Sequence, residues 1–155
     1  MNEILTSYIL PCLWALFACV GFGLVFNIQG FGIFITGIGG GLGWLVYLLM
    51  MELQNNDIFA AFVAAMAIAA YSELMARVRR CPVTGYLQIA LLPLVPGAGV
   101  YRAMTYCVEG YTQLFGITLL HTIGFAAALS VGAMLASSVV RTILPRFPRK
   151  PRSQR

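Results

Sequence analysis

Long apolar runs alternate with short polar connections along the 155-residue chain. Each run has about the 20 residues that a helix needs to cross the hydrocarbon core of a bilayer at about 1.5 Å per residue. Runs of this length favour helices over barrel strands, because a helix satisfies its backbone hydrogen bonds within one segment. The pattern predicts an all-α integral membrane protein with about five transmembrane helices, at residues 4–26, 31–51, 58–76, 83–108 and 114–140.

The connections are too short to hold another folded unit, so we expect residues 1–141 to form one transmembrane domain. A basic, proline-rich tail follows it at residues 142–155. The first run is expected to be retained rather than cleaved as a signal, because the opening "MNEILTSY" carries Glu3 where a signal peptide has basic residues.

The fourth run contains the stretch "LLPLVPGAGVYRAM", residues 91–104, which interrupts the helical pattern. Pro93 and Pro96 each remove a backbone donor and clash with the preceding turn. Gly97 and Gly99 weaken the helix further. Counted from the start of the run, the interruption falls near the bilayer midplane. The sequence therefore predicts a fourth helix broken into two halves, with a simple proline kink that only aids packing as the alternative.

A break at this depth is tolerated only where protein or a water-filled cavity covers the backbone. A half-helix that starts near Gly97 would direct free N–H groups and the positive end of its dipole toward that cavity. Arg102 lies about one turn further along and would add a fixed positive charge. Discontinuous helices of this kind hold carboxylates in transporters. The expected substrate-pathway residues of the segment are Pro93, Pro96, Gly97, Gly99, Tyr101 and Arg102.

Small residues recur at four-residue spacing on three of the runs, which lets helices approach closely in lipid. The glycines of "GIGGGLGW", residues 37–44, show this spacing and lack the Lys-Ser/Thr pair of a nucleotide-binding loop. The third run shows it in its alanines, and the fifth shows it at Gly124, Ala128, Gly132 and Ala136. Such faces favour helix packing within the chain, with a homo-oligomer interface as the alternative.

Composition and charge support a membrane protein and give it an orientation. The chain is 60% hydrophobic and 10% charged, against about 25% charged residues in soluble domains. Nine of the ten basic residues lie in two clusters beside apolar runs, at residues 77–80 and 141–155, so the net charge of +5 does not indicate nucleic-acid binding. With five crossings both clusters fall on one side. The positive-inside rule then places the N-terminus outside and the tail in the cytoplasm.

Two ionisable side chains near the cytoplasmic end of the third run are spaced to meet on one helix face. Glu73 and Arg77 stand four residues apart, a spacing that suits an ion pair. They are either an interfacial pair or a part of gating or proton coupling, because ionisable groups within membrane segments are often functional.

Other polar positions leave their roles open. His121 is the only histidine and is either a hydrogen-bonded packing residue or a proton relay. Asn27 ends the first run, where its amide would cap the helix or contact a substrate. The four cysteines have no metal or redox spacing. We expect no metal site, no cofactor and no catalytic residues, because the sequence shows no nucleophile–base pair and no cluster of metal ligands.

The chain resembles the threonine/serine exporter family over nearly its whole length, and within it the small five-helix subunit of the two-component type. The segment "SELMARVRRCPVTGYLQIALLPLVPGAGVYRAM" carries the most specific likeness, and "GFGLVFN" with Asn27 and "GLGWLVYLL" with Trp44 carry the rest. His121 falls on no position of the family pattern. The candidate site residues that fall on it are Asn27, Glu73, Arg77, Pro93, Pro96, Gly97, Tyr101 and Arg102.

The resemblance implies export of small polar metabolites across a bacterial inner membrane, either amino acids such as threonine and serine or small carboxylates. Because the sequence has no nucleotide-binding motif, we expect a secondary exporter coupled to an ion gradient. It also implies a larger companion membrane subunit, because some family members fuse both halves in one chain. The alternative is a non-transporting scaffold or regulatory subunit of a larger transporter.

Overall fold

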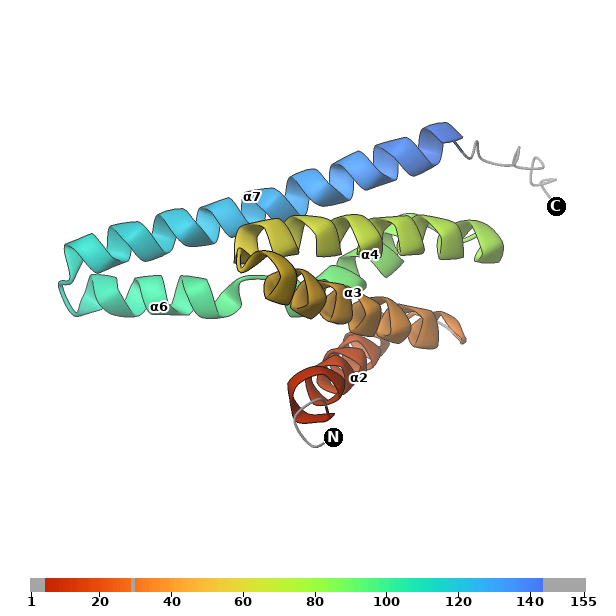
Figure 1. Cartoon of the computed structure of the whole chain (residues 1–155). Coiled ribbons are helices and arrows are strands. Elements are labelled where there is room, and N and C mark those ends of the chain that lie inside the picture. The colour runs from red at the N-terminus through yellow and green to blue at the C-terminus, as the bar shows by residue number, and fades with distance from the viewer. Residues whose placement is uncertain (1–4, 29, 144–155) are drawn as a thin grey trace, which may run out of the picture.

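The computed structural model describes residues 5–28 and 30–143, and every regular element among them is helical (Figure 1). The expectation of an all-helical chain is therefore confirmed for the described residues. Glu3 and residues 144–155 of the basic tail lie outside them. The elements are the π-helical turn η1 (Leu5–Ile9), α2 (Leu10–Val25), α3 (Gly32–Gln54), α4 (Asp57–Arg79), α5 (Val83–Leu91), the 3-10 turn η2 (Leu92–Leu94), α6 (Gly97–Val108) and α7 (Thr112–Ile143).

Three of the described helices, α3, α4 and α7, are long and apolar enough to cross a membrane. The segment from α5 through α6 passes the same test when its two bent halves are taken as one span. The α-helix of the first expected span starts only at Leu10, because Pro11 in its first turn has no N–H and favours a helix start. This leaves α2 with 16 residues, preceded by the π-helical turn η1. The chain is thus a multi-pass membrane protein.

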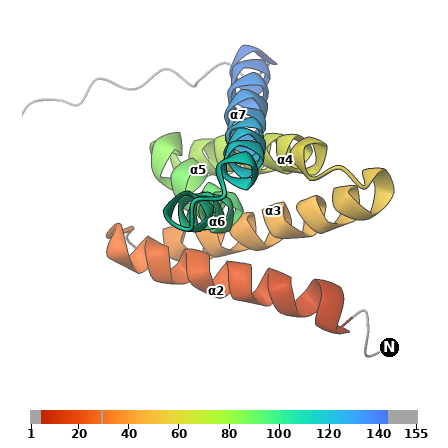
Figure 2. The same cartoon turned by 90° about the vertical axis from the view of Figure 1, so that its left-hand side faces the viewer.

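Helix α3 lies between α2 on one side and α4 and α5 on the other, as Figure 2 shows. Its glycines make both approaches close. Gly40 lies against the Sγ atom of Cys19 in α2, and Gly43 lies against the side chain of Ile68 in α4. A Cβ atom on either glycine would overlap these side chains, so different glycines of α3 serve two different neighbours.

Helices α4 and α7 pack side by side and run in the same direction (Figure 1). At their centre, a Cβ atom on Gly132 would lie 2.5 Å from the carbonyl oxygen of Phe62 and 3.3 Å from the Cβ atom of Ala65. Two side-chain contacts join the helices nearer their ends. Asp57 meets His121, 64 positions later, and Glu73 meets Arg141, 68 positions later. Because the offset stays nearly constant, the helices are parallel, and the segment between them returns along the bundle once.

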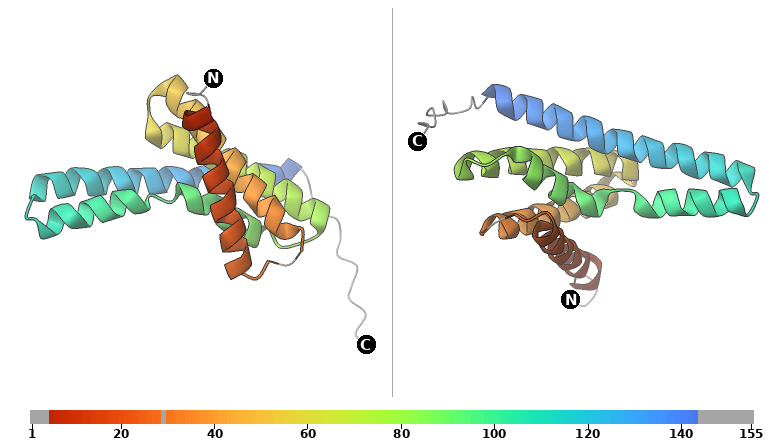
Figure 3. Two further views of the ribbon diagram at one scale, coloured as in Figure 1. Left: turned by 90° about the horizontal axis from the view of Figure 1, so that it is seen from below. Right: turned by 180° about the vertical axis from the view of Figure 1, so that it is seen from behind.

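That returning segment is the broken helix, with a bend of 51° between its two halves (Figure 3). Pro93 lies in η2 and Pro96 immediately precedes α6, while Val95 between them leaves the helical region at φ −59° and ψ 128°. Leu94 is 3% exposed and lies beside Gly43, roughly halfway along α3. Beyond the break, α6 follows the first half of α7, and the two extend past the loop that joins α3 to α4.

We expect Gly132→Ala to weaken the packing of α4 against α7, and Gly116→Ala on the same helix to leave it intact. A Cβ atom at residue 132 would meet a backbone oxygen at 2.5 Å, whereas nothing lies within 4 Å of one at residue 116. Overpacking of this kind costs about 1–3 kcal/mol. Thermal unfolding of both variants in detergent measures the difference, and equal melting temperatures would contradict the close contact.

Candidate functional site

A groove of about 400 Å³ lies beside the broken helix. Its walls come from α3, the start of α4, the break with the first turns of α6, and α7. Its volume lies within the range of small-molecule sites. The lining residues are Trp44, Tyr47, Asp57, Pro93, Leu94, Val95, Pro96, Ala98, Gly99, Arg102, His121, Thr122 and Phe125.

Side chains of both charge signs line this groove. Asp57 is the first residue of α4, which the side chain of Asn56 caps by accepting two backbone N–H groups at 3.1 and 3.2 Å. A carboxylate oxygen of Asp57 lies 3.1 Å from Nε2 of His121 on α7. The two side chains keep 31% and 51% of their surface exposed, so the pair is accessible from the groove. Arg102 of α6 brings a guanidinium to the same groove.

The start of α6 adds backbone donors. The amide of Val100 makes a helical bond to the carbonyl of Pro96 at 3.1 Å. The amides of Ala98 and Gly99 come before that bond, so helix geometry offers them no acceptor one turn earlier. Gly99 lies close to α7, where a Cβ atom would stand 2.6 Å from Oγ1 of Thr122. The absence of a side chain at residue 99 therefore lets the start of α6 lie close against α7, and both Ala98 and Gly99 line the groove.

Aromatic side chains of α3 and α7 also line the groove. The ring centroids of Trp44 and Tyr47 lie 5.6 Å apart, and those of Tyr47 and Phe125 lie 6.1 Å apart. The indole nitrogen of Trp44 is buried and has no hydrogen-bond partner among the described residues. A buried donor of this kind is costly unless something accepts its hydrogen.

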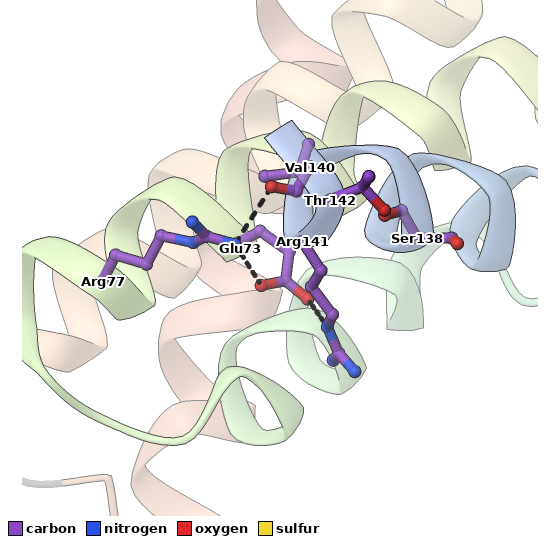
Figure 4. A network of polar contacts seen from close by, with 6 residues as sticks. All are labelled: Glu73, Arg77, Ser138, Val140, Arg141 and Thr142. Atoms are coloured by element: carbon purple, nitrogen blue, oxygen red, sulfur yellow. Dashed lines mark hydrogen bonds and ion pairs between the residues drawn. The ribbon is translucent and has the colours of Figure 1, made fainter. Parts of the chain in front are cut away.

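A second polar cluster joins α4 to α7 at the other end of the pair (Figure 4). Glu73 is only 1% exposed, and its Oε1 atom lies 2.6 Å from Nε of Arg141. Its Oε2 atom lies 3.9 Å from Nη2 of Arg77, which also donates to the carbonyl of Val140 at 3.1 Å. The spacing of Glu73 and Arg77 predicted their contact, but the closer partner is Arg141, which sequence analysis grouped with the basic tail.

Comparison with known proteins assigns the chain to a family. The family model described as "Threonine/Serine exporter, ThrE" matches residues 11–139. The chain belongs to the threonine/serine exporter family. It is also 26% identical over 117 residues to a protein of Haemophilus influenzae described as "Uncharacterized protein". That alignment covers 76% of this chain and 36% of the relative, so the chain spans about a third of the relative's length. No solved structure matches.

The groove of this exporter-family chain brings together four of the expected pathway residues, which are Pro93, Pro96, Gly99 and Arg102. Two neighbours in sequence lie outside the groove lining. Gly97 is exposed at the start of α6, and Tyr101 is 73% exposed.

Asn27 lies apart from the groove. It follows α2 with a left-handed backbone at φ 53°, and the amides of Asn27 and Ile28 bond back to carbonyls of the last turns. This backbone geometry is a common helix ending. Asn27 precedes α3, which begins at Gly32, and the first groove residue of α3 is Trp44. Trp44 lies twelve residues, or about 18 Å, along the helix from Gly32.

The sequence pattern did not mark Asp57 as a site residue, and it left His121 without a partner. An Asn-Asp pair before an apolar run does indicate a helix start, but nothing local links it to a histidine 64 residues later. The four cysteines are free. Among the described residues, no three His, Cys, Asp or Glu side chains come together as metal ligands.

We expect Arg141→Ala to loosen the C-terminal end of α7 in this exporter-family chain. After this change the buried carboxylate of Glu73, which is 1% exposed, keeps only the guanidinium of Arg77 at 3.9 Å. A buried acceptor that loses its partner costs about 1–3 kcal/mol of stability. Hydrogen exchange should become faster in residues 137–143. Arg79→Ala, which removes an exposed arginine from the same end of α4, is the control. Equal exchange in the two variants would show that the Glu73 pair does not hold this end.

Proposed function

We propose that the chain is a subunit of a secondary exporter that moves small polar metabolites across a bacterial inner membrane. The proposed substrates are amino acids such as threonine and serine, or small carboxylates. The observation that carries this proposal is the groove beside the broken helix, where Arg102, Asp57 and free backbone donors meet. Family membership supports it, as does the general rule that ionisable groups within membrane segments are costly and usually functional.

A substrate carboxylate would bind between Arg102 and the start of α6. The amides of Ala98 and Gly99 and the positive end of the α6 dipole both favour an anion at this place. The indole N–H of Trp44 is a further donor for a substrate oxygen. Transporters use discontinuous helices for the same purpose, because the break frees backbone groups near the substrate.

The proposed topology has five crossings, with the N-terminus outside and the C-terminus in the cytoplasm. The parallel packing of α4 and α7 supports a single return by the broken helix between them. The first crossing would consist of η1 and α2 together. Arg77, Arg79, Arg80 and Arg141 then lie on the cytoplasmic side, as the positive-inside rule requires.

In this topology the groove belongs to the outer half of the protein, and the Glu73 cluster belongs to the cytoplasmic half. Asp57 and Glu73 are sixteen residues apart on α4, or about 24 Å along its axis. An accessible groove at one end, and a buried Glu73 carboxylate paired with Arg77 and Arg141 at the other, fit an outward-facing state of an alternating-access transporter. Glu73, Arg77 and Arg141 would then form the cytoplasmic gate.

The proposed partner is a larger companion membrane subunit within the same bilayer. Nearly two thirds of the Haemophilus influenzae relative lies outside its match to this chain, so that protein has room for both halves. Helix α6 contacts α7 on one face and leaves Tyr101, Met104 and Val108 exposed on the other. The companion would cover that face, with a second copy of this chain as the alternative. Tyr101 would then act at the subunit boundary, and Asn27 would contact substrate at another stage of transport.

We expect Arg102→Ala and the double variant Pro96→Ala/Gly97→Leu to lower efflux about tenfold or more. Arg102→Ala removes a charge-assisted hydrogen bond, worth about 1.5–3 kcal/mol, and the double variant rebuilds a continuous helix across the break. Vesicles that contain both subunits and are loaded with labelled serine or succinate measure the efflux. Arg79→Ala is the control, since it removes the same charge away from the groove.

Unchanged efflux in well-folded variants would refute the assignment of the site. Full efflux by the companion without this chain would instead favour the competing role, a scaffold or regulatory subunit that does not transport.

A further inference from the structure

The proposed carboxylate site uses neither Asp57 nor His121, although both line the same groove. Nε2 of His121 stands 3.1 and 3.2 Å from the two carboxylate oxygens of Asp57. Nε2 of His121 therefore occupies both carboxylate oxygens of Asp57, and a cationic ligand would need those same oxygens. The imidazole bonds both oxygens best when it is protonated, because its Nε2 atom is then a charged donor.

The ionisable groups that line the groove come from four different helices. They are Tyr47 on α3, Asp57 on α4, Arg102 on α6 and His121 on α7. The break itself contributes apolar residues, from Pro93 to Pro96. Asp57 is thus the one carboxylate among the described lining residues, and it is the place where a cation in the groove would bind.

We infer that Asp57 alternates between protonated His121 and the ammonium group of the substrate, so that a proton and a substrate exclude each other from the groove. This inference rests on the proposed function and adds the site at which protons act. An amino acid would place its carboxylate on Arg102 and the α6 amides, and its ammonium group on Asp57. The proton of His121 would then pass to water, because the ammonium group occupies its counter-ion and Arg102 lines the same groove as a second cation.

The exchange gives the direction of transport. In the proposed topology the groove faces outward, and an acidic exterior supplies the proton to His121. The protonated ring binds Asp57 again and displaces the ammonium group, so the substrate leaves toward the outside. Two ligands that compete for one group are coupled reciprocally, and a proton gradient directed inward would drive an outward flow of substrate.

The single histidine makes this competition measurable without any variant. The full chain, labelled with ¹⁵N-histidine, is placed in lipid nanodiscs with its unlabelled companion, and its spectrum is recorded over a pH series with and without ligand. We expect L-serine to move the ring ¹⁵N resonances toward those of neutral imidazole. Acetate, which has a carboxylate and no ammonium group, should not do so.

Variants test whether Asp57 is the shared group. Asp57→Asn should abolish the response of the ring to serine, whereas Glu109→Gln, which removes an exposed carboxylate at the end of α6, should keep it. In vesicles, His121→Gln should abolish the stimulation of serine efflux by external acid. A purely structural tie between α4 and α7 would change the melting temperature in these variants and leave the acid stimulation in place.

The outcomes separate this inference from the proposed function. Wild-type vesicles could export serine while the imidazole resonances do not respond to serine, or His121→Gln could keep its acid stimulation. Either result would refute the competition at Asp57 and leave the proposed exporter function intact. Export of succinate without serine has the same consequence, since succinate carries no ammonium group. If wild-type vesicles export neither compound, the proposed function fails.

Discussion

The parallel packing of α4 against α7 is the constraint on which the rest of the structure depends. The two helices approach closely because Gly132 lies against the backbone of Phe62, and polar side-chain contacts join them at Asp57–His121 and Glu73–Arg141. Because the two helices run in the same direction, the chain that joins the end of α4 to the start of α7 must run back along the bundle. The broken segment makes that return, which places its Pro-Gly stretch against α3 and α7.

The break is tolerable because one side of it packs on α3 while the other lines the groove. A backbone that leaves the helix at membrane depth must find partners or face a cavity. Leu94 anchors the break against the glycine face of α3, and Gly99 lets α6 start close to α7. The freed amides therefore share a groove with Arg102 and Asp57. Stable packing and a polar site thus come from the same small residues.

Much of the fold was predictable because its causes are local. Apolar runs of membrane length predicted the helices, and Pro93 and Pro96 predicted the break. The start of the first span was less predictable, because a single proline at residue 11 moved the α-helix start to Leu10. At the site, Arg102 and Gly99 followed from their place after the break. Tyr101, adjacent to Arg102, lies outside the groove, since neighbouring residues on a helix face different directions.

The sequence by itself determined the helices, the broken span and the meeting of Glu73 with Arg77, because each depends on residues within about a turn or on the length of one run. Only the tertiary structure paired Asp57 with His121 and Glu73 with Arg141, across 64 and 68 residues. Such partners depend on the relative register of two helices. That register is set by how small side chains on α4 and α7 fit together, and the fit becomes visible only when both surfaces are known in three dimensions.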